Sequence, residues 1–318
     1  MIKKISLYAL LYSGIIVSSE DFGIAIHGGA GVMAGLTEDQ QLRIEEKISE
    51  TLIGSFKILK DGGNSLDAVE FAVSELEDSP LFNAGKGSVY NANYVQEMDA
   101  SIMYGLDRSA GAVASVKTVR NPIKLAKKVL EETEHVLLVG EGAETFAKNT
   151  GVKIVSPSYF HSEKNLLRLK KAKKITSNTI FQDKIGTVGA VAIDKKGNIS
   201  AATSTGGMTN KMPGRVGDSP IIGSGTWAQN DFCGVSSTGH GEFFIKFQVA
   251  KEVCTRMEYL NQSLETSSQG IINELDEIDA KGGLIAIDKN ANIFMPFNTD
   301  GMIRGSLTSK SQLTVAIY

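Results

Sequence analysis

The strongest constraint on the fold is an abrupt change of sequence character at residue 186. A polar, lysine-rich stretch from about 156 to 186 ends there, and small and β-branched residues follow at 187–193. Such residues fit the pleated surface of a strand, so the sequence predicts a buried strand that begins at Thr187. A second run at 199–204 follows a Lys-Lys-Gly-Asn turn, and the two runs predict a β-hairpin. By itself, a threonine at the start of a strand indicates structure rather than catalysis.

Strand and helix patterns recur in pairs on both sides of this hairpin. Thr37 and Gln40 have the spacing of a capping box, and apolar residues at helical spacing predict a helix from there to about 60. Asn64 or Ser65 can cap a second helix, to about 76. Other expected strands are 98–104, 111–116, a buried strand at 136–139, 232–238, 284–288 and 293–296; other expected helices are 121–130, 142–151, 241–260 and 263–278. We expect 156–186 to be a flexible linker, and paired strands with paired helices to form an α+β fold with stacked sheets inside.

Charge and composition argue against a nucleic-acid partner. The chain has 33 Lys and Arg against 36 Asp and Glu, a formal charge of -3. The basic run 170–174 has no interleaved aromatic residues, so a solvated surface is the better interpretation. With 33 glycines and 6 prolines, we expect many tight turns and close backbone approaches.

Metal and nucleotide motifs are missing from the sequence. The spacing of Cys233 and Cys254 fits no zinc or redox motif, and we expect both to be buried thiols. The four histidines are scattered singly, so we expect neither a catalytic metal nor any other cofactor for catalysis. The glycine cluster at 23–31 lacks both the GxGxxG order and the Walker lysine. Near Lys86, the first glycine that a phosphate loop requires is missing.

The N-terminus has the order of a secretory signal peptide. Lys3 and Lys4 precede an apolar run at 5–17, and small residues follow to about 19. The run is shorter than the ~20 residues that a membrane span needs. We therefore expect residues 1–19 to be a signal peptide and the protein to be periplasmic or secreted. The alternative is a strand extension of a cytoplasmic protein.

A cut before Thr187 would create a nucleophile and a base on one residue. A threonine hydroxyl is a weak nucleophile that needs a nearby base. A free α-amino group titrates at about 7.7–8.0 and can accept a proton near neutral pH. Gly186 has no side chain to obstruct attack on its carbonyl.

Two other segments have more than one interpretation. Arg215 and Asp218 can form an ordinary exposed ion pair, or they can hold the carboxylate and ammonium of an amino acid. Thr238 and Gly239 can be a strand end with a tight turn, or they can supply donors to an oxyanion. Local sequence does not decide between these alternatives.

Longer motifs add a family resemblance. They are Gly186-Thr187, Pro-Leu-Phe-Asn-Ala-Gly-Lys-Gly at 80–87, Thr-Ser-Thr-Gly-Gly at 203–207, Gly-Arg-Val-Gly-Asp-Ser-Pro at 214–220, Thr-Gly-His-Gly-Glu at 238–242 and Pro-Phe-Asn-Thr-Asp-Gly-Met at 296–302. Together they resemble the plant-type asparaginase and isoaspartyl peptidase family of N-terminal nucleophile (Ntn) hydrolases. The resemblance covers residues from about 23 to 305.

The resemblance implies a four-layer αββα sandwich that is cut between Gly186 and Thr187. Residues 20–186 would form the α subunit, residues 187–318 the β subunit, and both together one Ntn-hydrolase domain. Two such cleaved protomers would form a dimer. A structural sodium ion would bind the backbone carbonyls of Leu76, Glu77, Ser79, Phe82, Ala84 and Lys86.

The resemblance also implies roles for individual residues. Thr187 would be the nucleophile, with Thr205 bonded near it, Thr238 and Gly239 at the oxyanion, Arg215 at the substrate carboxylate, Asp218 and the Gly241 carbonyl at the ammonium, and Asn83 near the new amino terminus. The expected substrates are isoaspartyl dipeptides and L-asparagine. The alternatives are an N4-(β-N-acetylglucosaminyl)-L-asparaginase and an uncleaved amino-acid-binding protein without turnover.

Overall fold

The computed structural model describes residues 21–174 and 186–318. The expected signal peptide at 1–19 and the 175–185 part of the expected linker lie outside the described residues. Within the described ranges, no helix combines the length and the apolar character that crossing a membrane requires.

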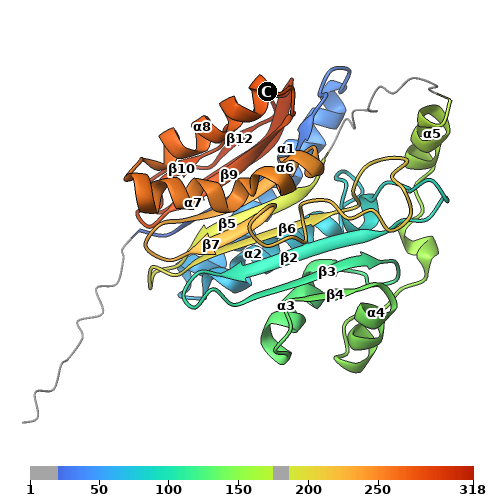
Figure 1. Cartoon of the computed structure of the whole chain (residues 1–318), viewed down its shortest axis with the longest axis horizontal. Helices are drawn as coiled ribbons and strands as arrows, with labels where there is room; N and C mark the ends of the chain where they lie inside the picture. Colours follow the sequence, from blue (N-terminus) through green and yellow to red (C-terminus); the bar gives the residue numbers. More distant parts are fainter. Residues whose placement is uncertain (1–20, 175–185) are drawn as a thin grey trace, which may run out of the picture.

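Two stacked β-sheets occupy the centre of the structure (Figure 1). In spatial order, the large sheet contains β12 (Thr314–Ala316), β11 (Gly301–Thr308), β1 (Gly23–Gly31), β5 (Val188–Ile193), β6 (Ile199–Thr205), β2 (Met98–Tyr104), β3 (Ala110–Val116) and β4 (Leu137–Val139). The small sheet contains β10 (Ile293–Phe294), β9 (Gly282–Asp288), β8 (Cys233–Gly239) and β7 (Thr226–Gln229). The strands pair antiparallel, apart from β3 with β4.

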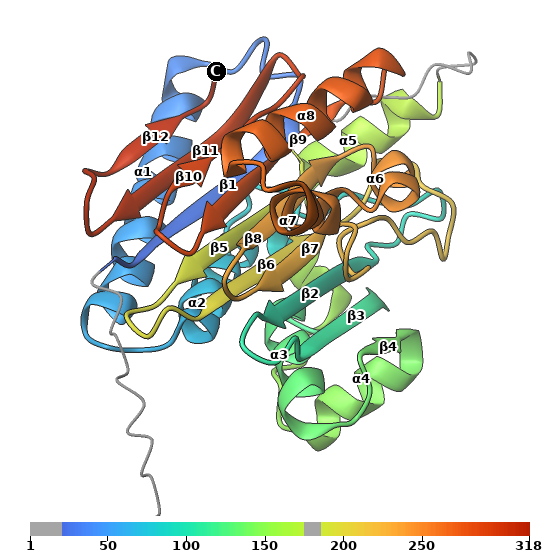
Figure 2. The same cartoon turned by 60° about the vertical axis from the view of Figure 1, so that its left-hand side comes forward.

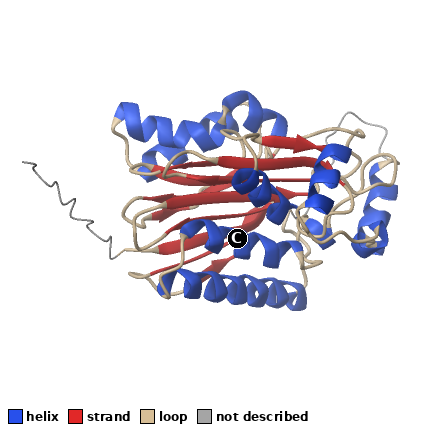
Figure 3. Ribbon diagram, turned by 90° about the horizontal axis from the view of Figure 1, so that it is seen from below, coloured by secondary structure: helices blue, strands red, loops and turns tan. Residues whose placement is uncertain are grey.

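Helices flank the two sheets on both outer faces (Figures 2 and 3). The large sheet is covered by α1 (Glu38–Lys60), α2 (Ser65–Glu77) and α3 (Pro122–Glu132), and the small sheet by α7 (Val249–Leu260) and α8 (Leu264–Glu277). The shorter helices are η1 (Gly85–Gly87), α4 (Gly140–Asn149), η2 (Pro157–Phe160), α5 (Glu163–Ala172) and α6 (Gly241–Phe247). The prediction of stacked sheets with helices outside is therefore confirmed.

The predicted hairpin lies in the middle of the large sheet and is buried on both faces. Side chains of β5 alternate between two cores, as a strand period of two requires. Val188 and Ala190 pack toward α1–α3, whereas Val191 and Ile193 pack toward the small sheet and its helices. Every residue of β5 and β6 is buried. Because both faces of these strands are covered, the β5 run contains small and apolar residues without polar alternation.

The two predicted N-terminal helices are confirmed together with their caps. Thr37 Oγ1 accepts a hydrogen bond from Gln40 N at 3.3 Å, and Gln40 Oε1 accepts one from Thr37 N at 3.1 Å. Asn64 Oδ1 accepts from Asp67 N at 2.7 Å and caps α2. These reciprocal bonds satisfy amide groups that a helix start otherwise leaves unpaired.

The expected linker is partly wrong, because η2 and α5 form within it. The buried residues of α5 include Leu169 and Ala172, so the lysines that suggested a solvated linker occupy its other face. The amide of Asn165 donates to the carbonyls of Gly87 at 2.8 Å and Ser88 at 3.1 Å. These contacts attach α5 to the loop after α2.

The expected buried strand at 136–139 is also wrong in its burial. β4 is an edge strand, and Val139 is 53% exposed. Its residues are apolar, as in a core strand. The strand nevertheless lies at the edge of the sheet, where its side chains remain exposed or half-buried. Conversely, β11 and β12 do not appear among the predicted strands, although β11 pairs with β1 along most of its length.

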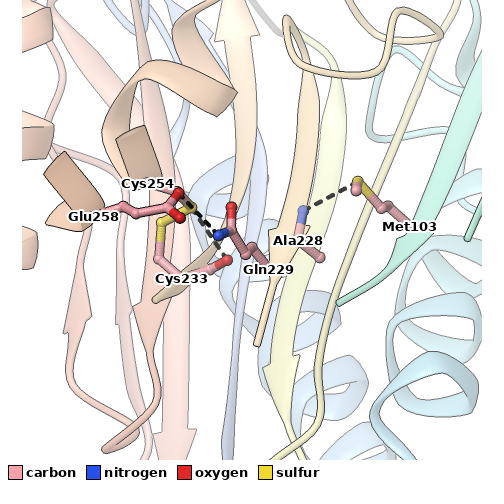
Figure 4. Close-up of a disulfide and its surroundings, with 6 residues drawn as sticks. All are labelled: Met103, Ala228, Gln229, Cys233, Cys254 and Glu258. Atoms are coloured by element: carbon pink, nitrogen blue, oxygen red, sulfur yellow. Dashed lines mark hydrogen bonds between the residues drawn. A yellow bond between two sulfur atoms is a disulfide. The ribbon is translucent and has the colours of Figure 1, made fainter. Parts of the chain in front are cut away.

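The expectation of two free thiols is wrong. Cys233, the first residue of β8, forms a disulfide with Cys254 on α7, with 5.5 Å between their Cα atoms (Figure 4). Both residues are fully buried, as expected. The pairing arises because α7 folds back over β8, and a sequence separation of 21 gives no sign of that contact.

We predict that removing this cross-link destabilises the fold. Disulfides restrict the unfolded chain, and a loop of this length contributes about 3 kcal/mol in the chain-entropy model. The double variant Cys233→Ala/Cys254→Ala should lose about that free energy of unfolding in urea denaturation. The Asp61→Asn variant, on the exposed surface, is the control. Alkylation of two thiols in unreduced, denatured protein would contradict the prediction.

Candidate functional site

A cavity of about 440 Å³ opens where β5, β6 and β8 meet the 206–225 loop. The predicted site residues that line it are Asn83, Gly186, Thr187, Thr205, Arg215, Asp218, Thr238 and Gly239. Gly241 lies beside them, since a Cβ placed on it would be 2.7 Å from Asp218 Oδ1. Residues from five separate sequence motifs therefore meet at one place.

Thr187 is held directly before the first residue of β5. It is 8% exposed, and its Oγ1 donates a hydrogen bond to Thr205 Oγ1 at 3.0 Å. Thr205 ends β6, and its Oγ1 also accepts from Gly207 N at 2.9 Å. The predicted contact between the two threonines is thus present.

His27 on β1 is a site residue that the sequence did not reveal. Its Nδ1 lies 3.0 Å from the Thr187 carbonyl oxygen, and its Nε2 lies 3.0 Å from Ser236 Oγ. Burial lowers the pKa of His27 to about 3, although the Thr187 hydrogen bond opposes that shift, so the ring is neutral at neutral pH. Because a carbonyl can only accept, Nδ1 carries the hydrogen and Nε2 accepts from Ser236.

Glycines create the space around this contact. A Cβ at Gly189 would lie 1.9 Å from Ser236 Oγ and 2.4 Å from His27 Nε2. Gly29 has φ +108°, and a Cβ there would lie 2.4 Å from Gly186 N. The glycine cluster at 23–31, interpreted from sequence as structural, therefore allows β1 to pass directly against Gly186.

Thr238 faces the same peptide segment from the small sheet. Its Oγ1 accepts a hydrogen bond from Ala30 N at 3.2 Å. A Cβ on Gly186 would lie 2.9 Å from Thr238 Oγ1 and 3.1 Å from the Ala30 carbonyl oxygen. Thr238 is thus within reach of Gly186 in the uncut chain.

Arg215 and Asp218 do not form the ion pair that is one interpretation of their spacing in the sequence. Arg215 Nε and Nη2 each donate to the Glu242 carboxylate, both at 2.9 Å. Glu242, on α6, is 27 residues away, and nothing in the local sequence indicated it as a partner.

Asp218 is a buried carboxylate next to the cavity. Its Oδ2 has no hydrogen-bond partner among the residues that the structure describes. Burial raises the pKa of Asp218 to about 7, although the nearby Arg215 charge opposes the shift. Buried polar atoms are normally satisfied, so an unpartnered carboxylate oxygen beside a cavity indicates a place for a positively charged group of a ligand.

Buried side chains support the loop that contains Arg215 and Asp218. Lys211 Nζ donates to the Glu97 carbonyl at 2.8 Å and lies 3.9 Å from Asp99 Oδ2. Burial lowers the pKa of Lys211 and raises that of Asp99. The Asn83 amide donates to the Gly207 carbonyl at 2.7 Å, so the predicted Asn83 also helps hold this loop.

In the loop expected to bind sodium, two backbone carbonyl oxygens lie close to glycines. A Cβ at Gly85 would lie 2.4 Å from the Glu77 carbonyl oxygen, and one at Gly87 would lie 1.9 Å from that of Phe82. Two of the six predicted carbonyl oxygens therefore lie so close to a glycine that a side chain there would clash with them. Hard cations such as sodium prefer oxygen ligands. Across the described ranges, no group of three or more His, Cys, Asp or Glu side chains could hold a metal.

The Glu77 side chain has a structural role that the sequence did not indicate. Its Oε1 accepts from Ser204 Oγ at 2.6 Å and from Ile123 N at 3.0 Å, which connects α2 to β6 and α3. Burial raises the pKa of Glu77 to about 8, against the effect of these hydrogen bonds.

Comparisons with known proteins agree with this arrangement. A family model described as Asparaginase matches residues 20–317. An isoaspartyl peptidase of Salmonella typhimurium is 44% identical over 306 residues, covering 93% of this chain and 98% of that protein. The isoaspartyl peptidase of Escherichia coli is 44% identical over 306 residues, covering 93% and 95%. An isoaspartyl peptidase/L-asparaginase of Bos taurus is 43% identical over 269 residues, covering 84% and 86%.

We predict that Asp218 makes the fold less stable above neutral pH. Its pKa is about 7 in the folded protein and 3.8 in its ordinary state, so the folded state binds the proton more tightly. Its contribution therefore becomes more destabilising as pH rises from about 4 to about 7. The Asp218→Asn variant should be more stable than the wild type at pH 8, and the difference should shrink toward pH 4. Urea denaturation across this range measures it.

The matched control is Asp279→Asn, which changes an exposed carboxylate at the edge of the same cavity. Asp279 is 91% exposed, so this variant shows the effect of losing an acidic side chain that is not buried. If the Asp218→Asn difference did not change between pH 4 and pH 8, the buried carboxylate would not titrate as described.

Proposed function

This chain belongs to the asparaginase family, and on that basis we propose that it is a threonine amidohydrolase that hydrolyses β-aspartyl (isoaspartyl) dipeptides and L-asparagine and releases L-aspartate. One observation carries the proposal. Thr187, Arg215 and Asp218, whose Oδ2 has no hydrogen-bond partner among the described residues, line a single cavity. A nucleophile, a cation and an anion are what side-chain amide hydrolysis of an amino acid requires. Relatives named isoaspartyl peptidase support the substrate class.

The proposed fold is the four-layer αββα sandwich of the Ntn hydrolases. The flanking of both sheets by helices supports it. In the mature protein, residues 20–186 would be one subunit and residues 187–318 the other, within one domain. We also propose that two cleaved protomers form a dimer, as the family resemblance implies.

Maturation would begin with attack of Thr187 Oγ1 on the Gly186 carbonyl carbon. The Gly186–Thr187 amide bond breaks as an ester forms on the hydroxyl, and the nitrogen becomes a free amine. Water then hydrolyses the ester and releases the Gly186 carboxylate. The absence of a side chain at Gly186 and the close approach of Gly29 support this site for the cut.

Turnover would use the same hydroxyl, now beside the new α-amino group. The amine takes the hydroxyl proton while Oγ1 attacks the side-chain carbonyl of the substrate. The leaving amine takes that proton and departs, and water hydrolyses the acyl-enzyme to release aspartate. The Thr238 hydroxyl and the Gly239 N–H would donate to the oxyanion, and Thr205 would orient the nucleophile.

The substrate's amino-acid end would bind at the charged end of the cavity. Arg215 would hold the α-carboxylate, while Asp218 and the Gly241 carbonyl would hold the α-ammonium. Since the carboxylate of Asp218 is buried, its interaction with an ammonium is screened little by solvent. Asn83, on the cavity wall, would lie near the new amino terminus.

A structural sodium ion would bind the carbonyls of Leu76, Glu77, Ser79, Phe82, Ala84 and Lys86. The crowding of the Glu77 and Phe82 carbonyls against glycines supports this site. The Leu76 carbonyl already accepts hydrogen bonds from Ser79 N and Asp78 N. The Ala84 carbonyl accepts one from Gly87 N and keeps a second lone pair. The ion would order the loop that contains Asn83, and the chemical steps would use groups of the chain itself.

We further propose that the protein is exported after removal of residues 1–19. The buried disulfide supports this location, because disulfides persist in oxidising compartments and are rare in the cytoplasm. Cell fractionation with N-terminal sequencing tests it. A full-length N-terminus in the cytoplasmic fraction would exclude export.

We predict that maturation converts one chain into two. Intact-mass measurement of fresh and incubated protein should show fragments that end at Gly186 and begin at Thr187. The Thr187→Ala variant should remain a single chain and release no aspartate, because it lacks the attacking hydroxyl. Aspartate release by protein without a new Thr187 end would contradict this, and a wild type that stays intact would favour a binding protein without turnover.

We predict that Arg215→Ala raises KM for isoaspartyl dipeptides by roughly 10- to 100-fold, since hydrogen bonds to charged groups contribute about 1.5–3 kcal/mol. Steady-state release of aspartate from β-Asp-Leu measures it. A parallel assay with N4-(β-N-acetylglucosaminyl)-L-asparagine distinguishes the proposed activity from the alternative one. A strong preference for this sugar conjugate over β-Asp-Leu would exclude the proposed isoaspartyl peptidase activity. Unaltered kinetics in Arg215→Ala would exclude carboxylate binding by this residue.

A further inference from the structure

The guanidinium of Arg215 already has a bidentate partner inside the protein. Glu242 Oε1 accepts from Nε and Oε2 accepts from Nη2, both at 2.9 Å. Such two-point contacts fix the plane of a guanidinium as well as its position. The Arg215 side chain is 15% exposed, so neighbouring residues surround most of it.

The Glu242 carboxylate is itself held at the start of α6. His240 Nε2 lies 3.3 Å from Glu242 Oε2. Burial alone would raise the pKa of Glu242, but the hydrogen bonds and charge of Arg215, together with smaller effects of the Glu242 backbone and His240, hold that pKa below its ordinary value. Glu242 is therefore ionised at neutral pH and remains a full charge partner for Arg215.

The contact with Glu242 leaves another edge of the guanidinium available. Nη1 makes no hydrogen bond within the described chain, and Nη2 has a second hydrogen. A Cβ at Gly217 would lie 2.8 Å from Nη1, and one at Gly241 would lie 3.0 Å from Nη2. Both residues are glycine, so neither places a side chain against these two nitrogens.

Two roles for Glu242 are compatible with an Arg–Glu contact, and they predict opposite effects. Glu242 can orient Arg215 for a ligand, or it can compete with the ligand for the same donors. Competition requires that both carboxylates use one edge. Because Glu242 uses the Nε–Nη2 edge and the Nη1–Nη2 edge remains, the geometry favours orientation.

We propose that Glu242 is a positioning residue that fixes the Arg215 guanidinium so that its Nη1–Nη2 edge binds the α-carboxylate of the substrate. The inference rests on the proposed function, in which Arg215 is the carboxylate anchor. Without Glu242, the long arginine side chain would sample other rotamers, and the substrate would have to order it on binding. The effect belongs to binding, so KM should change and kcat should not.

A double-mutant cycle tests the proposal. We would prepare Glu242→Ala, Glu242→Gln, Arg215→Ala and the Arg215→Ala/Glu242→Ala double variant, each after maturation. Kinetics with β-Asp-Leu and calorimetric Kd values for L-aspartate are the readouts. With Arg215 present, Glu242→Ala should raise KM and Kd about tenfold or more and leave kcat within about twofold. Glu242→Gln should show a smaller rise, because an amide can accept only one of the two hydrogen bonds.

In the Arg215→Ala background, Glu242→Ala should have no further effect beyond about twofold, because the residue acts through Arg215. Equal effects in both backgrounds would overturn the proposal. A decrease in KM for Glu242→Ala would also overturn it and would show competition.

The matched control is Glu274→Gln, which changes another glutamate that contacts one arginine twice. Glu274 accepts from Arg256 Nη2 at 2.8 and 2.9 Å and does not line the cavity. Its KM should equal that of the wild type. Maturation rates should also be equal among the Glu242 variants and the wild type. The unfolding midpoint of Glu242→Ala should fall, because Arg215 loses its charge partner, so kinetics and Kd are measured at a temperature at which every variant is folded.

The calorimetric arm separates failure of this inference from failure of the proposed function. If wild-type protein released no aspartate from any substrate, the proposed function would fail. An Arg215-dependent Kd for aspartate that Glu242→Ala weakens would then still support the positioning role. If Glu242→Ala did not fold, Glu242→Gln would give the same comparison with one hydrogen bond removed.

Discussion

The arrangement of the site depends on the path of one strand, β1, past the Gly186–Thr187 segment. β1 pairs antiparallel with β5 until His27 faces Gly189, where the backbone ladder between them ends. Beyond that point the His27 side chain continues the connection through the Thr187 carbonyl. The strand then shifts its register near Gly28, and its next residues pass Gly186 and reach Thr238 through Ala30 N. A single strand thus positions the residues on both sides of the proposed cut and the proposed oxyanion donor.

The second end of the cavity depends on buried charge. Asp218 is buried with an unpartnered oxygen, and Lys211 with Asp99 lies under the same loop. Burial of ionised groups is unfavourable unless partners compensate, which is why the pKa of Asp218 is raised. A buried carboxylate without a partner destabilises the ligand-free protein. A ligand with a positively charged group would compensate for that loss of stability. The loop tolerates this because Asn83 and Glu97 hold its backbone independently of any ligand.

Local sequence signals account for what could be predicted. The hairpin at β5 and β6 and the capped helices follow from strand patterns and caps, whereas the meeting of five motifs at one site is implied by the family resemblance. Three features could not be predicted, namely the disulfide of Cys233 with Cys254, the Glu242 partner of Arg215 and the contact of His27 with Thr187. Each joins residues that are far apart in sequence, and the choice of partner is made by packing of the two sheets. The prediction for β4 was wrong for a different reason. Its apolar residues suggest a buried strand, but the strand lies at the sheet edge and is exposed.

The disulfide connects fold stability with the geometry of the proposed oxyanion donors. Cys233 fixes the start of β8 against α7, and the end of β8 pairs with β9, where Thr238 faces Gly283. Immediately after the strand, His240 N donates to the Lys281 carbonyl at 3.0 Å. A strand held at both ends presents Thr238 and Gly239 with little freedom, and donors that are fixed before reaction stabilise an oxyanion best. Since the bond forms only where thiols can be oxidised, the rigidity of this strand depends on the compartment in which the chain folds.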